Sequence, residues 1–79
     1  MTIRIRYFGQ LVELVGKEEE YKDLVEGFTL KKLELELLSS YQINATYYRI
    51  ALNQIIEENK ETMLNNNDEV ALLPPFAGG

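Results

Sequence analysis

The N-terminal segment has the alternation of a β-strand. Between residues 2 and 8, apolar and polar side chains alternate with period two, which predicts a half-buried strand. Ile3, Ile5 and Tyr7 share the face expected to be buried. Phe8 falls on the opposite face, together with two arginines.

Two later segments have the spacing of helices. The first, residues 10–15, is short and is followed by Gly16, which is typical of a C-terminal cap. The main helix begins after Thr29, a good N-cap residue. Its apolar side chains recur every three or four residues, as an amphipathic helix requires: Leu30, Leu33, Leu37 and Tyr41. Leu35 falls outside this stripe, and we expect it to be exposed.

The remaining pattern predicts further strands and the fold class. The expected strands are residues 18–25, 48–53, 54–57 and 69–73, with a turn at residues 66–68 before the last one. Strands and helices do not alternate strictly, so a doubly wound parallel sheet is not expected. The sequence predicts an α+β fold with a mixed sheet of about five strands and one main helix on one face. The other face of the sheet is then left open.

Composition excludes several kinds of active site. The chain has 79 residues, enough for one small domain, and it contains neither cysteine nor histidine. Disulfides, thiolate nucleophiles and cysteine-based zinc sites are therefore excluded. The usual general base at neutral pH is missing as well. We expect no metal and no cofactor bound by this chain alone.

Charge narrows the choice of partners. The formal net charge is −5 at pH 7, whereas nucleic-acid binding needs clustered Lys and Arg. The acidic surface favours a basic protein partner. No apolar run approaches the roughly 20 residues needed to cross a bilayer, and the N-terminus lacks the apolar block of a signal peptide. We therefore expect a cytoplasmic location with no nucleic-acid or membrane partner.

The last six residues differ in kind from the rest. Pro74 and Pro75 end the last strand, because proline has no backbone N–H and fixes φ. Two successive prolines favour a stiff, extended segment. Phe76, Ala77 and a terminal Gly78-Gly79 follow. We therefore divide the chain into a domain at residues 1–73 and a projecting, flexible tail at residues 74–79.

The tail is suited to presenting the chain terminus. Glycine has no Cβ, so Gly78 and Gly79 can thread a channel too narrow for other residues. Such a channel would receive the α-carboxylate, which has a pKa of about 3.3–3.7 and is ionised at neutral pH. An ionised carboxylate is a poor electrophile and needs activation, for which adenylation by ATP is the usual route. A terminal Gly-Gly taken alone, however, is also typical of a frayed end.

Three motifs together resemble a known family, the small sulfur-carrying subunit of molybdopterin synthase, which has the ubiquitin-like β-grasp fold. The resemblance covers nearly the whole chain. The first motif is Tyr7-Phe8-Gly9-Gln10 together with Glu13-Leu14-Val15-Gly16. The second motif is Leu52-Asn53-Gln54. The third motif is Asp68-Glu69-Val70-Ala71, followed by two leucines and by Pro-Pro-Phe-Ala-Gly-Gly at the chain end. The third motif is the most specific. Asn66-Asn67-Asp68 stands where the family often has Asp-Gly-Asp.

The resemblance implies a function for Gly79. An E1-like adenylating enzyme, related to the ubiquitin-activating enzymes, would use ATP to convert the Gly79 carboxylate to an acyl-adenylate. A sulfur donor protein would then yield a thiocarboxylate. The tail, from Pro74 to Gly78, would thread into the large synthase subunit in a heterotetramer and deliver sulfur to a cyclic pterin precursor. The chain would not be catalytic alone.

The resemblance also implies a docking patch on the sheet. The family docks its partners through exposed apolar side chains, and the matching positions are Phe8, Ile56 and Leu73. The strand alternation independently places Phe8 opposite Ile3 and Ile5. An open sheet face that carries such side chains is typical of a binding site.

Three other functions remain open at this point. The chain would carry sulfur for thiamine, cysteine or tRNA thiolation if its partner belonged to one of those pathways. It would be a ubiquitin-like protein modifier if Gly79 were joined to lysines of other proteins. It would be a pure binding module if the tail had no role.

Overall fold

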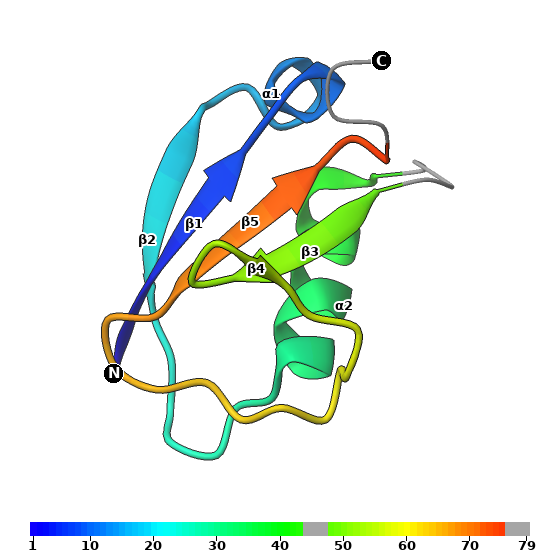
Figure 1. The fold of residues 1–79 in the computed structure, drawn as a ribbon. Coiled ribbons are helices and arrows are strands. Elements are labelled where there is room, and N and C mark those ends of the chain that lie inside the picture. The colour runs from blue at the N-terminus through cyan, green and yellow to red at the C-terminus, as the bar shows by residue number, and fades with distance from the viewer. Residues whose placement is uncertain (44–47, 76–79) are drawn as a thin grey trace.

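The computed structural model describes residues 1–43 and 48–75. Over these residues one mixed sheet is crossed on one face by a long helix (Figure 1). The strands are β1 (Thr2–Tyr7), β2 (Glu19–Asp23), β3 (Arg49–Leu52), β4 (Ile55–Ile56) and β5 (Glu69–Leu73), and the helices are α1 (Gln10–Val15) and α2 (Leu30–Tyr41). The β-grasp architecture expected from the sequence is confirmed, with five strands and one main helix.

The strand order explains how the two ends of the domain meet. The sheet runs β2-β1-β5-β3-β4, with β1 and β5 parallel and every other pair antiparallel. A parallel pair needs a long crossover connection, and α2 lies within the one between β1 and β5. The first and last strands are therefore neighbours at the centre of the sheet (Figure 1).

The core lies between α2 and one face of the sheet. Ile3 and Ile5 of β1 are fully buried, as are Leu30 and Leu33 of α2. Thr29 caps α2 as predicted, because its side chain accepts a hydrogen bond from the backbone N–H of Lys32 at 3.2 Å. Leu35 is 56% exposed, also as predicted.

Some element boundaries differ from the sequence-based expectation. β2 ends at Asp23, two residues early, since Leu24 turns into the core and Val25 is left exposed. β3 ends at Leu52 because Asn53 and Gln54 both have positive φ, at 52° and 70°, which is typical of a tight hairpin turn. The turn before β5 is confirmed, with Asn67 at φ 71°.

The side chain of Glu20 in β2 connects three elements of the fold, β1, β2 and α2. Its carboxylate accepts hydrogen bonds from the hydroxyls of Tyr7 in β1 and Tyr41 in α2. Burial opposes ionisation, but these two bonds outweigh it and hold the pKa of Glu20 below its ordinary value. Burial and the bond to Glu20 raise the pKa of Tyr7. The sequence gives Glu20 no role distinct from its charged neighbours, because nothing local marks its distant tyrosine partners.

Replacing Glu20 should therefore weaken the fold in a pH-dependent way. A carboxylate whose pKa is depressed by folding stabilises above its unfolded pKa of about 4.5 and loses that effect as pH falls. We expect Glu20→Gln to lower the free energy of unfolding at pH 7 by about 1.5 kcal/mol, the low end of what hydrogen bonds to charged groups contribute, since both bonds are only partly buried. Urea unfolding between pH 3 and pH 7 measures it. Glu18→Gln, at an exposed neighbouring position, is the control, and an equal loss in both variants would contradict the role of Glu20.

Candidate functional site

The tail begins at the central strand of the sheet. β5 ends at Leu73, and Pro74 and Pro75 follow it as half-buried residues outside the strand. The backbone N–H of Phe8 donates to the carbonyl of Leu72 at 3.1 Å, which holds the ends of β1 and β5 together. Residues 76–79, which include the reactive terminus expected from the sequence, lie outside the described residues. The predicted division at residue 73 coincides with the end of β5.

Gly9 supports the start of the tail. A Cβ added to Gly9 would lie 2.6 Å from Cγ of Pro74, closer than any ordinary carbon contact, and Gly9 has φ +58°. Only glycine fits this backbone beside the proline ring without a shift. The sequence gives no sign of this contact, because the two residues are 65 positions apart (74 − 9) and no local pattern links them.

Gly9→Ala should consequently cost more stability than Gly16→Ala. Gly16 also has a positive φ, at +87°, but nothing lies within 4 Å of its Cβ position. Gly16→Ala carries the backbone cost of about 1–2 kcal/mol for an αL residue. Gly9, at φ 58° and ψ −135°, lies outside the αL region, where a non-glycine residue is more strained, and Gly9→Ala also adds the clash with Pro74. Urea unfolding should show the difference, and Pro74→Ala should recover part of it in the Gly9→Ala background. Equal losses at the two glycines would rule out the contact with Pro74.

The three predicted patch residues meet on the open face of the sheet. Phe8, Ile56 and Leu73 all line one groove of about 240 Å³, although they come from separate elements. Ala51 and Ala71 are direct partners across β3 and β5 and line the same groove. The small side chains of Ala51 and Ala71 leave room for the groove, and the larger side chains of Phe8, Ile56 and Leu73 border it. Ile56 is 38% exposed, and Phe8 and Leu73 are half-buried. We call Phe8, Ile56 and Leu73 the apolar patch.

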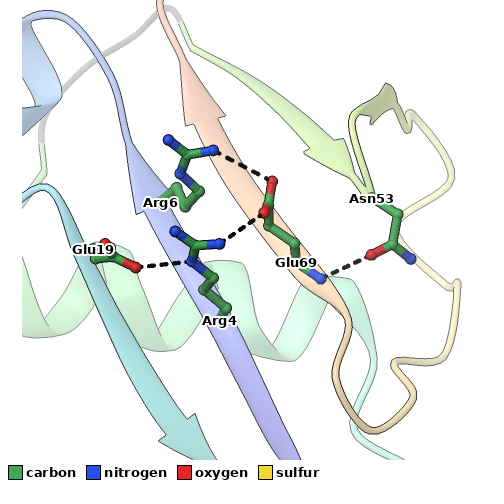
Figure 2. Close-up of polar contacts among 5 residues, drawn as sticks. All are labelled: Arg4, Arg6, Glu19, Asn53 and Glu69. Atoms are coloured by element: carbon green, nitrogen blue, oxygen red, sulfur yellow. Dashed lines mark hydrogen bonds and ion pairs between the residues drawn. The ribbon is translucent and has the colours of Figure 1, made fainter.

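A row of alternating charges lies beside the apolar patch. Figure 2 shows Arg4 and Arg6 side by side on β1, with Glu19 of β2 on one side of them and Glu69 of β5 on the other. Arg4 pairs with Glu19 at 2.8 Å and with Glu69 at 3.5 Å, whereas Arg6 lies 3.9 Å from Glu69. We call these four residues the charged row. The sequence shows that Arg4 and Arg6 share a face, but it does not show which acids they meet.

The backbone of Glu69 is fixed by Asn53. The N–H of Glu69 donates to Oδ1 of Asn53 at 2.9 Å, and the N–H of Asn53 donates to the carbonyl of Glu69 at 2.7 Å (Figure 2). Asn53 also donates to buried Asp68 through its side-chain amide at 3.0 Å. The Leu52-Asn53-Gln54 motif thus holds the hairpin after β3 against the start of β5.

The described residues contain no cluster of three or more His, Cys, Asp or Glu side chains placed to hold a metal ion. Within the same ranges, no helix is long and apolar enough to cross a membrane. The features described above that can support binding are the apolar patch, the charged row beside it and the strand end from which the tail leaves.

Comparison with known proteins gives consistent matches over the full length. A model of the ThiS family matches residues 5–79. The molybdopterin synthase sulfur carrier subunit of Dictyostelium discoideum is 33% identical, over 96% of this chain and 94% of the relative. The protein of the same name from Chlamydomonas reinhardtii is 30% identical over the full length of both chains.

Solved structures also resemble the fold. A complex of subunits 1 and 2 of the molybdopterin-converting factor from Helicobacter pylori contains a chain that is 28% identical, with a TM-score of 0.75 and full coverage of both chains. The small archaeal modifier protein 1 from Methanosarcina acetivorans is 23% identical, with a TM-score of 0.76, over 99% of this chain and 96% of the other. This second likeness concerns the fold alone.

Proposed function

The chain belongs to the ThiS family, and from this we propose that it is the sulfur carrier subunit of molybdopterin synthase, acting in the biosynthesis of the molybdenum cofactor. The full-length relatives with that name support this pathway. One structural observation carries the proposal: the apolar patch surrounds the end of the strand from which the tail leaves, and Leu73 belongs to both. A single partner surface can therefore cover the patch and receive the tail.

The reactive group in this proposal is the terminal carboxylate of Gly79. The chain has no cysteine to carry a persulfide and no histidine to act as a base, which agrees with sulfur carried on the backbone terminus, as the family resemblance implies. Attack of the carboxylate on ATP gives an acyl-adenylate and releases pyrophosphate. A sulfur nucleophile then displaces AMP and leaves a thiocarboxylate. The ATP belongs to the activating enzyme, and no residue of this chain is assigned to bind it.

The tail positions that group at a distance from the fold. Pro74 is placed by its contact with Gly9, and the prolines restrict the backbone as it leaves the sheet. Phe76, Ala77 and Gly78 then connect this base to Gly79. In our proposal they thread the partner's channel, and the two glycines occupy its narrowest part.

The partner that receives the tail is the large subunit of molybdopterin synthase in this proposal. The Helicobacter pylori complex of subunits 1 and 2 supports it, because its small chain resembles this one over the full length. The catalytic side chains then belong to the large subunit. An E1-like adenylating enzyme and a sulfur donor protein precede this step, and two loaded carriers supply the two sulfurs of one dithiolene.

Intact mass spectrometry tests the loading step. The chain is incubated with the adenylating enzyme, ATP and a sulfur source. We expect its mass to rise by the difference between one sulfur and one oxygen atom. Omission of ATP should abolish the change. Higher-mass adducts on other proteins would indicate a protein modifier instead. An unchanged mass would count against sulfur carriage for molybdopterin and against sulfur carriage for any other pathway.

A further inference from the structure

Arg6 stands where the charged row meets the apolar patch. It lines the same groove as Phe8, Ile56 and Leu73. Its guanidinium carbon lies over the Phe8 ring, 5.0 Å from the ring centroid. A partner that covers the apolar patch therefore covers Arg6 as well.

The electrostatic pairing of Arg6 is incomplete. Arg4, the other arginine of the charged row, has a carboxylate on each side, with Glu19 at 2.8 Å and Glu69 at 3.5 Å. Arg6 has only Glu69, at 3.9 Å from Nη1 to Oε1, which is too long for a hydrogen bond. Over residues 1–43 and 48–75, no hydrogen bond from the Arg6 guanidinium is found. Arg6 is thus paired more loosely than its neighbour Arg4, and Figure 2 shows Glu69 as the one acid joined to it.

Covering Arg6 makes this incomplete pairing costly. Arginine stays ionised at any physiological pH, and a charge removed from water without a partner is strongly destabilising. Glu69 is poorly placed to complete the pairing, because Arg4 shares its carboxylate and Asn53 fixes its backbone N–H. Glu19 stands directly opposite Arg6 in the β1–β2 register, but its carboxylate pairs with Arg4 at 2.8 Å. A carboxylate of the molecule that covers the groove would supply the acceptor that these two side chains do not.

We propose that Arg6 is a specificity-determining residue. Its guanidinium donates hydrogen bonds to a carboxylate side chain of the partner protein that docks on the apolar patch. This inference rests on the proposed function. A carboxylate can take two N–H groups of the guanidinium at once, while the Phe8 ring below keeps the guanidinium plane in place. The partner surface is then apolar opposite the patch and acidic beside it.

The distribution of charge supports an acidic partner at this point. The chain carries a net charge of −5, and its three arginines, Arg4, Arg6 and Arg49, lie on the open sheet face beside the carboxylates of Glu19, Glu58 and Glu69. Among these arginines, Arg6 is the one that lines the groove. The net charge by itself favours a basic partner, whereas a carboxylate is favoured locally at Arg6.

Arg6→Met gives the sharpest test, because methionine keeps an apolar stem and removes the charge. Isothermal titration with the large subunit of molybdopterin synthase from the same source, at low and at high salt, measures the affinity. We expect Arg6→Met to weaken binding about 10-fold at low salt, as for other close interfacial charge pairs. We also expect a smaller dependence on salt than for the unchanged chain. Arg6→Lys should recover only part of the affinity, since lysine lacks the planar fork.

The controls separate this inference from the proposed function. Lys31→Met makes the same charge change at an exposed position of α2, on the helix side, and should leave affinity unchanged. One outcome would contradict the inference alone: Arg6→Met binds at least as tightly as the unchanged chain, while Phe8→Arg weakens binding. The proposed role of Arg6 is then wrong, and the apolar patch is still the docking face. If neither variant changes the affinity, the docking face is elsewhere and both proposals fail. Thermal unfolding of each variant verifies that it is folded.

Discussion

Removal of Gly78 and Gly79 is expected to abolish sulfur transfer and leave the fold intact. The truncated chain ends in the carboxylate of Ala77, which sits two residues short of the position that the proposed channel serves. Two residues of extended chain span roughly 7 Å, and a displacement of even about 1 Å can cost 100-fold in rate. No thiocarboxylate should form with the adenylating enzyme, ATP and a sulfur source, and the large subunit should give no product.

The fold of the truncated chain should be unaffected, because the buried core residues found within 1–43 and 48–75 all lie between Ile3 and Leu72. The midpoint of thermal unfolding is therefore expected to match that of the full chain. Ala77→Gly is the matched control, since it alters the tail but keeps its length and both terminal glycines, and it should still be loaded with sulfur. Sulfur transfer by the truncated chain would refute the assignment of Gly79.

Phe8→Arg is expected to weaken binding to the large subunit about 100-fold, because it places a charge in the centre of the apolar patch. Arg6 lies against the same ring, so the new guanidinium also meets a like charge. Phe8 is only half-buried and its side chain is on the open face of the sheet. The fold should therefore tolerate the change, and titration with the large subunit measures the loss.

Leu35→Arg is the matched control for Phe8→Arg. Leu35 is an exposed apolar residue of α2, on the side of the sheet away from the patch. The same change of side-chain chemistry there should leave the affinity for the large subunit unaltered. Similar losses in both variants would show a nonspecific effect of added charge and would count against the apolar patch.

The strands and helices were largely predictable because their signals are local. The alternation of Ile3, Ile5 and Tyr7 fixes the buried face of β1, and Thr29 followed by leucines marks the start of α2. Each signal depends on neighbours a few positions away. Boundaries were less well predicted where the backbone turns with positive φ, as at Asn53, since that conformation depends on the hairpin it closes.

The three residues of the patch were predicted from the family resemblance. For Phe8 and Leu73, the strand alternation also predicted that their side chains lie on the sheet face opposite the core. The geometry of the patch was not predictable, because the groove needs Ala51 and Ala71 to be paired across two strands. That pairing depends on sheet register, which is set by contacts between segments about 20 positions apart.

The sequence by itself determined most elements of the fold and the absence of cysteine and histidine, and it predicts a terminus suited to carrying an activated acyl group. These follow from residue types and short-range order. Only the tertiary structure decided that Gly9 lies against Pro74, that Glu20 binds two tyrosines, and that Arg6 lies beside the patch with Glu69 as its ion-pair partner. Each of these depends on the distance between segments far apart in the chain, and the sheet sets that distance when β1 and β5 pair.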